Sequence, residues 1–428
     1  MKLHTKILLG LLAGLAAGIT TNLTVGVDNA TVGWINTYIA GPIGQIFLRM
    51  LFMIVIPLVF ASIALGVFGL GDIRKVGRIG GKTLAYFLGT TVLAATLGLI
   101  VVNIMQPWEQ VTPETRVELM DRFSSAAAGR VEQAETTAKF GPETFVNIVP
   151  RNPIDSAART DMLGIIFFGL MFGAALTLLP AARAKPLVDV LEALSDVVVK
   201  IIDFAMMLAP YGVACLIFTV SSEFGIPLLI AVAAFVITVL IALALHVLIT
   251  VSAIVRFAIG MSPVVFFSRI KAVMVTAFST SSSSATLPTS LNVAETQLGV
   301  PRQIGGFVLP LGATMCMNGT SIFEGITVIF LAQIFGIELT ILQMGVVMVL
   351  AVVTAIGAAG VPGGSIPLLV GILVMFGVPG EAIAIVLGVD RLLDMSRTTV
   401  NVITDLTATC IIGKAEGVWS PKDLPTAT

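Results

Sequence analysis

The chain has 428 residues, of which 57% are hydrophobic and only 11% are charged, with 24 Lys and Arg against 25 Asp and Glu. This balance gives no basic excess of the kind that binds nucleic acid, so we expect no nucleic-acid partner. Apolar stretches of about 20 residues, the length that crosses a bilayer, recur along the chain and predict an all-α polytopic membrane protein in contact with lipid. The 3 cysteines all lie in apolar segments and indicate neither a disulfide scaffold nor a zinc site.

Eight transmembrane helices are expected from these stretches. In chain order they cover 6–24, 41–68, 83–105, 160–182, 188–220, 226–257, 302–334 and 380–414. The first stretch, with Lys2 and Lys6 before an apolar run, has the features of a signal peptide as well. We favour a retained first helix, because the segments that follow insert in any case.

Basic loops set the expected orientation. The loop at 69–82 carries Arg74, Lys75, Arg78 and Lys82, and a second basic segment, AARAK, covers 181–185. Because cytoplasmic loops are enriched in Lys and Arg, both loops and both termini should lie in the cytoplasm. The long polar insertion at 106–158 should then face outward, and we expect the cell inner (plasma) membrane as the location.

Two further segments do not fit a simple span. The first, 262–296, centres on STSSSSATLP, and the second, 340–377, centres on GAAGVPGGSIP. Each has apolar arms around small or helix-breaking residues, a pattern typical of a re-entrant helical hairpin whose broken backbone is buried in protein. Each is followed by a helix with a polar patch. This weak internal repeat is typical of the inverted repeats of secondary transporters.

The segment DMSRTTVNVITD, residues 394–405, puts charged groups into an apolar helix. Asp394, Arg397, Asn401 and Asp405 are separated by offsets that place them on one stripe, together with Thr398. Intramembrane charges cost several kcal/mol unless they are paired or hydrated, so a function is favoured over a structural pair between Asp394 and Arg397. An Arg fork suits a carboxylate and an Asp suits an ammonium group. Together they predict a site for an acidic amino acid.

The serine run Ser281–Ser284 lies at the centre of the first hairpin. It could form only a flexible tip, but hydroxyl and amide N–H groups between apolar arms also suit an anion. We favour the anion-binding interpretation.

Two other classes of protein compete with the transporter interpretation. The sequence GLGD at 69–72 matches the Gly-x-Gly-Asp pattern of intramembrane aspartyl proteases. Its Asp72 precedes a basic loop and the chain has no Tyr-Asp partner motif, so we expect no enzyme. A channel is the second alternative, but a channel has no need of an amino-acid-shaped site.

Four motifs in one order carry a specific resemblance that covers essentially the whole chain. They are TAFSTSSSSATLP (276–288), GATMCMNGTS (312–321), AAGVPGGS (358–365) and DRLLDMSRTTVNVITD (390–405). The sequence resembles the glutamate/aspartate transporter family, the dicarboxylate/amino acid:cation symporters, as a prokaryotic member. The resemblance implies a homotrimer in which a transport domain slides against a scaffold, an elevator mechanism. Its domains would be 1–82 (first two scaffold helices), 83–105 (third helix, transport domain), 106–225 (scaffold helices four and five) and 226–428 (transport core with both hairpins).

The resemblance also implies roles for residues of the site. Asp394 would bind the substrate amino group and Arg397 its side-chain carboxylate. The main carboxylate would contact Asn401 and the first hairpin tip. The other implied contacts are Thr398, Thr320, Ser282, Ser283 and Ser284, with Val361, Pro362 and Gly363 on the second tip as a gate. The dicarboxylate branch lacks an Asp at the Asp394 position, which favours an amino acid over a C4-dicarboxylate. The neutral amino acid branch lacks the Arg at Arg397.

Departures from the family pattern concern the coupling ion. The family motif Asn-Met-Asp-Gly-Thr reads Cys316-Met317-Asn318-Gly319-Thr320 here. In sodium-coupled members its Asn and Asp are sodium ligands, and a thiol and a neutral amide suit sodium poorly. The family's Tyr beside the third-helix ligands is Phe87 here. Other implied cation positions remain: Thr90, Thr91, Gly312, Thr314, Asn401 and Asp405.

Glu324 points to a proton as the alternative coupling ion. It lies one helical turn beyond Thr320 on the same face, and proton-coupled members of the family have Glu there. His246 is a weaker candidate for a proton carrier. The second arginine that family members place near the site is absent, since Ser281 and Met395 occupy its positions, and Arg391 is expected on a different face. We therefore expect an acidic amino acid transporter with weak or absent sodium dependence, no cofactor, and Na⁺ or H⁺ as coupling ion. The alternatives are a conventional sodium-coupled symporter and a C4-dicarboxylate transporter.

Overall fold

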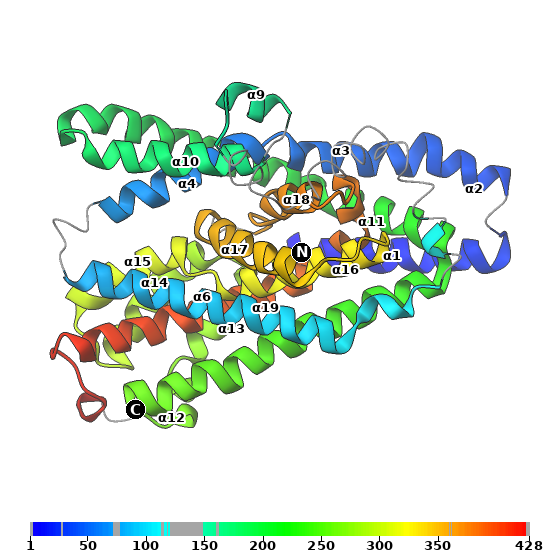
Figure 1. The fold of residues 1–428 in the computed structure, drawn as a ribbon. Coiled ribbons are helices and arrows are strands. Elements are labelled where there is room, and N and C mark those ends of the chain that lie inside the picture. The colour runs from blue at the N-terminus through cyan, green and yellow to red at the C-terminus, as the bar shows by residue number, and fades with distance from the viewer. Residues whose placement is uncertain are drawn as a thin grey trace.

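The computed structural model describes residues 3–26, 29–71, 78–112, 115–117, 119, 149–159, 162–358, 360 and 362–424. These residues form helices and no strand, as an all-α membrane protein should. Most helices run along one common direction (Figure 1). Asp72, Arg74, Lys75, Val361 and most of the insertion at 106–158 lie outside the described residues, so the expectations about them stay predictions.

The N-terminal part forms one side of the bundle. Its helices are α1 (Leu3–Thr24), α2 (Ala30–Ile35), η1 (Asn36–Ala40), α3 (Gly41–Phe52), α4 (Val55–Gly71), α6 (Arg78–Met105), η2 (Pro107–Gln110), α9 (Pro153–Ala158) and α10 (Met162–Leu178). The expected span 41–68 is therefore interrupted after Phe52. Pro57 lies in the first turn of α4, where its missing N–H leaves no helical hydrogen bond unmade.

A long helix, α11 (Ala181–Leu245), connects the two halves of the chain. Its 65 residues would extend about 100 Å if straight, far more than one bilayer. The backbone breaks at Gly225, whose φ of 61° lies in the left-handed region, so α11 consists of two helices. This break agrees with the expected boundary between 220 and 226. The basic segment at 181–185 was predicted to be a loop, and this prediction is wrong, because the segment forms the start of α11.

The C-terminal part follows through η3 (His246–Val251) and η4 (Ile254–Ile259). Its remaining helices are α12 (Pro263–Arg269), α13 (Lys271–Thr280), α14 (Ser283–Thr296), α15 (Arg302–Met315), α16 (Asn318–Ile334), α17 (Ile341–Gly357), α18 (Ile366–Met375), η5 (Gly380–Ile383), α19 (Ala384–Ala415) and η6 (Pro421–Asp423). The first segment expected as a hairpin, 262–296, contains α12, α13 and α14, with a non-helical tip between α13 and α14. The second, 340–377, contains α17 and α18 around its tip, and the expected span 302–334 is broken at Cys316 and Met317.

Close packing of small residues joins the first helix to α11. A Cβ atom built on Gly10 or Gly14 would collide with the carbonyl oxygens of Pro210 and Ala214, respectively. Glycines spaced by four residues let helix backbones approach closely in lipid, where apolar burial alone gives no driving force. The first helix therefore packs along its length as part of the bundle.

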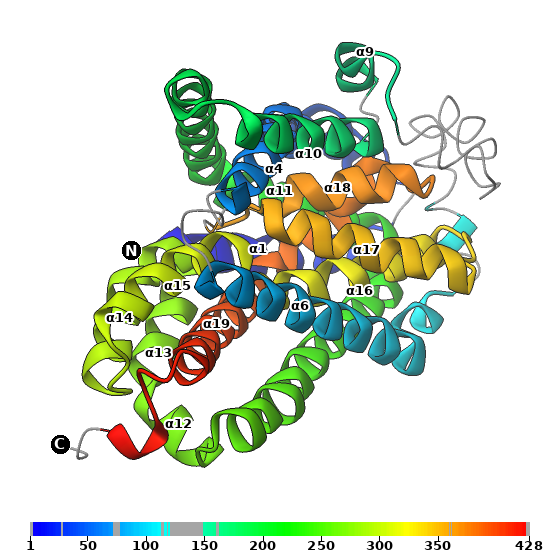
Figure 2. The ribbon, with the colours of Figure 1, turned by 60° about the vertical axis from the view of Figure 1, so that its left-hand side comes forward.

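The core of the molecule lies around α16, α18 and α19, whose residues are nearly all buried. Helices α4 and α10 lie on one side of this core, and α13, α14 and α15 gather on the other (Figure 2). Helix α19 packs against α11, α13, α15 and α16. This central position puts the polar stripe of α19 between the two hairpin tips and the broken helix.

Within the described residues, four helices are long and apolar enough to cross a membrane. They are Thr5–Thr24, Ile79–Gln110, Ala181–Ile259 and Arg302–Ile334, and the bent pair α12 and α13 could add a fifth. The stretch Ala181–Ile259 contains the break at Gly225 and is long enough for more than one crossing. An all-helical architecture is confirmed, whereas eight spans and the re-entrance of the hairpins stay predictions.

Candidate functional site

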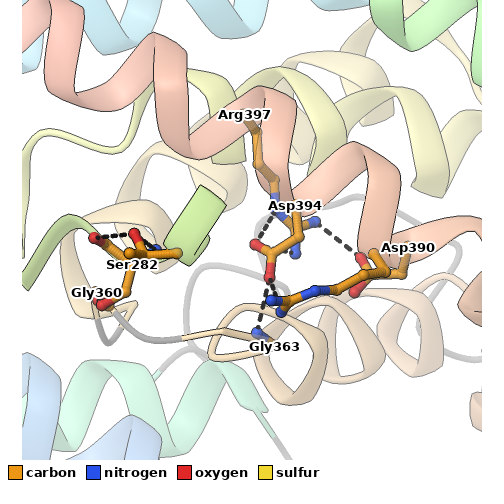
Figure 3. A network of polar contacts seen from close by, with 8 residues as sticks. Ser282, Gly360, Gly363, Asp390, Asp394 and Arg397 are labelled. Atoms are coloured by element: carbon orange, nitrogen blue, oxygen red, sulfur yellow. Dashed lines mark hydrogen bonds and ion pairs between the residues drawn. The ribbon is translucent and has the colours of Figure 1, made fainter. Parts of the chain in front are cut away.

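The tips of the two hairpins touch each other. Helix α13 ends at Ser281, whose φ of 52° is left-handed, and Ser282 caps α14 by accepting a hydrogen bond from the Ala285 N–H. The Ser282 hydroxyl donates to the Gly360 carbonyl over 2.6 Å, and the Ser284 N–H donates to the same oxygen over 3.2 Å (Figure 3). The first tip is therefore held against the second tip.

A broken helix forms the next wall of the site. Cys316 and Met317 are non-helical, and α16 restarts at Asn318. The Asn401 side chain of α19 accepts a hydrogen bond of 2.7 Å from the Gly319 N–H. This contact satisfies one of the N–H groups that the start of any helix leaves unpaired. Asn401 thus fixes the start of α16 relative to α19.

Arg397 is the central charge of the site and is only 1% exposed. Its Nε donates to Asp394 Oδ1 over 3.0 Å, and its Nη1 lies 3.1 Å from Asp390 Oδ1 (Figure 3). Its guanidinium carbon lies 4.3 Å from the centre of the Phe323 ring, a cation–π arrangement. Its Nη2 also lies 3.0 Å from Asp394 Oδ1, so both Nη atoms form ion pairs with carboxylates, although neither pair has hydrogen-bond geometry.

The carboxylate of Asp394 links this charge to the second tip. Its Oδ2 accepts a hydrogen bond of 3.1 Å from the Gly363 N–H. Arg391 Nη1 lies 3.8 Å from the same oxygen, so the expectation that Arg391 faces elsewhere is wrong. The reason is helical spacing: residues three apart lie on neighbouring positions of one face. Arg391 supplies the second positive charge near the site.

A small polar cavity lies where these elements meet. Its volume is about 10 Å³, measured as the space open to the centre of a water molecule, which is about enough for one water. The lining residues are Ser281, Ser283, Met317, Thr320, Ala358, Gly360, Ser365, Asp394, Arg397, Thr398 and Asn401. Guanidinium and hydroxyl donors thus meet a carboxylate, a combination that suits a ligand with both charges. A ligand of the size of an amino acid would need a larger cavity than this one.

The predicted substrate residues divide into two groups. Six of them line this cavity: Ser283, Thr320, Asp394, Arg397, Thr398 and Asn401. Ser282 and Ser284 instead join the tips, Gly363 binds Asp394, and Pro362 is partly buried beside it. The structure therefore brings the predicted residues together, while their roles in binding stay predictions.

Four of the predicted cation positions, Thr90, Thr91, Cys316 and Asn318, lie in a second polar group around α6, η3 and the start of α16. The Thr91 hydroxyl donates to Asn318 Oδ1 over 2.8 Å, and the Cys316 thiol lies 3.8 Å from the same oxygen. Asn318 Nδ2 lies 3.3 Å from His246 Nε2. The Thr90 hydroxyl is directed to the carbonyl oxygens of Tyr86 and Phe87. Side-chain atoms at these positions are thus already joined by hydrogen bonds.

The other candidate positions are spread more widely. Asp405 is buried against Gly312, where a Cβ atom would lie 2.5 Å from Asp405 Oδ1, and this oxygen has no hydrogen-bond partner. The Thr314 side chain is exposed. Glu324 is fully buried, and its Oε2 accepts a hydrogen bond of 2.7 Å from Thr354 of α17, while its Oε1 has no partner. Glu324 thus lies one turn behind the cavity wall.

Several residues of the site were not singled out from the sequence. Asp390 continues the stripe of α19 by one turn before Asp394, and that spacing could have identified it. Phe323 and Ser365 come from other elements, and no signal in the sequence connects them to Arg397. The contact of His246 with Asn318 spans 72 residues of chain and could not be anticipated.

Comparison with known proteins agrees with this arrangement. The sequence matches the sodium:dicarboxylate symporter family over residues 3–415. It is 34% identical to the proton/glutamate-aspartate symporter of Escherichia coli over an alignment of 389 residues, and this alignment covers 91% of this chain and 88% of that protein. It is 35% identical over 379 residues to the proton/sodium-glutamate symport protein of Geobacillus stearothermophilus, covering 89% and 88%. A C4-dicarboxylate transport protein of Bacillus subtilis is 33% identical over 379 residues, covering 88% and 87%.

These matches confirm the resemblance seen in the four motifs and exclude the protease interpretation. The chain belongs to the sodium:dicarboxylate symporter family, and it is a membrane transporter rather than an enzyme.

Proposed function

We propose that the protein is a secondary active transporter of L-aspartate or L-glutamate. The observation that carries this proposal is the Arg397 guanidinium, which is buried at the cavity beside Asp394 and is held by ion pairs to Asp390 and Asp394 that leave both Nη atoms without hydrogen-bond geometry. A buried cation of this kind is costly unless it is paired or binds an anion. A carboxylate that enters the cavity would meet both Nη donors in the fork geometry that Arg offers.

The second charge of the site selects an amino acid over a plain dicarboxylate. In our proposal Asp394 receives the substrate ammonium group, and Asn401 and the first tip receive the main carboxylate. The oxygen of Asp394 that faces the second tip accepts a hydrogen bond from the Gly363 N–H. An ammonium group competes for that oxygen, so binding and the position of the tip are linked.

The names of the relatives support the same class of substrate. Relatives at 34% and 35% identity are named as glutamate or glutamate-aspartate symporters, and one at 33% as a C4-dicarboxylate transport protein. Transport of C4-dicarboxylates is therefore the second candidate. Asp394 argues against it, because a second anion gains nothing from a buried carboxylate at that place.

We further propose that sodium dependence is weak or absent and that a proton on Glu324 couples transport. Sodium prefers several oxygen ligands, and the Thr91, Asn318 and His246 side chains are already bonded to one another. Burial favours the protonated form of a carboxyl, and Glu324 has one oxygen without a partner. A conventional sodium-coupled symporter, with ions held near Asn401 and Asp405, is the rival proposal.

The wider architecture is proposed from the resemblance. We propose a homotrimer in the plasma membrane with eight spans, two re-entrant hairpins, both termini in the cytoplasm and an elevator mechanism. The contact between the two tips supports the part of this proposal in which the second tip is a gate.

The test is uptake into proteoliposomes with sodium and pH gradients set independently. Radiolabelled aspartate should accumulate, unlabelled glutamate should compete, and succinate should compete far less. An inward proton gradient should drive uptake without sodium. Uptake of succinate in preference to aspartate would favour the second candidate.

A further inference from the structure

His246 is fully buried in η3, where it faces the start of α16. Its Nε2 lies 3.3 Å from Asn318 Nδ2, and its Nδ1 has no hydrogen-bond partner. Among the described residues, Asn318 is the one hydrogen-bond partner of this buried imidazole. The bond to Asn318 is therefore the feature that orients the ring.

The neighbours of Asn318 fix which atoms donate. The Thr91 hydroxyl lies 2.8 Å both from Asn318 Oδ1 and from the Phe87 carbonyl oxygen, so its single proton can serve either acceptor. The Cys316 thiol also donates to Asn318 Oδ1 over 3.8 Å, and this contact favours the amide Nδ2 as the end that faces the ring. An amide NH₂ group only donates, and the imidazole must therefore accept at Nε2 and carry its proton on Nδ1. The ring is neutral, and it completes a chain of hydrogen bonds from Thr91 through Asn318 to His246.

This chain of bonds joins three elements at a critical point. Thr91 belongs to α6 and His246 to η3. Asn318 is the first residue of α16 and directly follows the non-helical residues Cys316 and Met317. The next two residues belong to the candidate site: the Gly319 N–H binds Asn401, and Thr320 lines the cavity. A contact that holds Asn318 in place therefore also holds Gly319 and Thr320 at the candidate site.

We propose that His246 is a positioning residue that takes the place of a bound cation, by holding Asn318 and with it the broken segment before α16. A cation would join oxygen ligands of α6 and α16 by its charge. Here a neutral imidazole and a neutral amide join the same elements by hydrogen bonds and leave no charge to be compensated. The inference rests on the proposed function, since it explains how substrate affinity becomes independent of sodium.

The first arm of the test measures aspartate affinity by calorimetry in sodium-free choline buffer. His246→Ala removes the acceptor and should weaken affinity roughly threefold to tenfold, the range expected for one lost hydrogen bond. His246→Gln places a side-chain oxygen near the position of Nε2 and should stay within about twofold of the wild type. Thr238→Val removes a buried hydroxyl of α11 that bonds only its own helix, and it should not change affinity.

The second arm measures the melting temperature of the substrate-free protein in sodium and in choline. The wild type should show no difference. Asn318→Asp alone should show none either, because the neutral imidazole in its other tautomer can donate to the new carboxylate. The double variant His246→Ala with Asn318→Asp has a carboxylate at position 318 and a cavity where the imidazole was, so sodium can bind there. Sodium should then raise the melting temperature of this variant by roughly 1–4 °C.

Each result separates the alternatives. Wild-type affinity in His246→Ala, or equal losses in the Ala and Gln variants, would overturn the positioning role. The replacement of a cation would be overturned if sodium raised the melting temperature of the wild type or of Asn318→Asp as much as that of the double variant. It would also be overturned if sodium raised the melting temperature of none of the three proteins. The melting-temperature measurement requires no substrate, and it does not use the His246→Ala single variant. If the wild type binds neither aspartate nor glutamate, the proposed function fails while this arm still tests His246.

Discussion

The backbone N–H of Gly363 donates a hydrogen bond of 3.1 Å to the carboxylate of Asp394. The second tip is thereby attached to the residue that we propose binds the substrate amino group. Since the Gly360 carbonyl of the same tip binds Ser282, the second tip contacts both the first tip and α19. Opening of the site must break these contacts, and closure over substrate must replace them.

A bulky residue at Gly363 should impair closure. Gly363 has a φ of 74°, a left-handed conformation that other residues adopt only at a cost of about 1–2 kcal/mol. Gly363→Val should therefore lower the rate of aspartate uptake more than tenfold, with a smaller effect on the amount of folded protein. Gly345→Ala is the matched control, because a Cβ atom there meets open space. Wild-type uptake by the Gly363 variant would argue against a moving second tip.

Loss of the Arg397 guanidinium should remove acidic substrates selectively. Arg397→Ala deletes the buried cation that we propose holds the side-chain carboxylate, so aspartate and glutamate binding should fall by about 2–5 kcal/mol. Binding of small neutral amino acids should fall much less. The exposed Arg256 gives a control for loss of one positive charge. Unchanged aspartate affinity in Arg397→Ala, with folding verified by its melting curve, would refute the assignment.

Asp394→Asn should distinguish amino acids from dicarboxylates. The substitution keeps the shape of the side chain and removes the charge opposite the ammonium group, which should cost aspartate about 2–5 kcal/mol. Succinate has no ammonium group, so its weak competition should stay the same or improve. Asp203→Asn, in an exposed pair with Lys200, is the control. Normal aspartate binding by the Asp394 variant would mean that the amino group is held elsewhere.

Glu324→Gln should uncouple transport from the proton gradient. Glutamine imitates the protonated carboxyl, so binding and exchange of aspartate should persist while accumulation driven by an inward proton gradient is lost. Glu338→Gln, an exposed residue beyond the end of α16, should leave the accumulation unchanged. Full proton-driven accumulation by the Glu324 variant would assign the proton to another group.

The sequence predicts the helical elements and the polar face of α19 because both depend on local spacing. A bilayer sets the length of a span, and the helical period puts Asp394, Arg397 and Asn401 on one stripe. The two tips were predictable for the same reason, since small and helix-breaking residues interrupt apolar arms. The break after Phe52 was missed, because its only local signal is Pro57, which continuous helices also contain.

Contacts between distant parts of the chain could not be predicted in this way. Nothing in the spacing of residues places Phe323 beneath Arg397 or His246 beside Asn318, since each pair depends on how whole helices pack. Arg391 shows a different limit. We expected its side chain on a different face, although a spacing of three residues from Asp394 permits a shared one, and only the structure shows that its guanidinium lies 3.8 Å from the carboxylate.

The most direct test of the account is a titration of the purified protein with aspartate in choline buffer and in sodium buffer. We predict submillimolar binding in both, with affinities that agree within about threefold, a difference of less than 1 kcal/mol. Affinity that falls by orders of magnitude when sodium is removed would contradict it. That result would show that Asn401, Asp405 and nearby carbonyl groups still hold the cation that the Thr91, Asn318 and His246 side chains were proposed to replace.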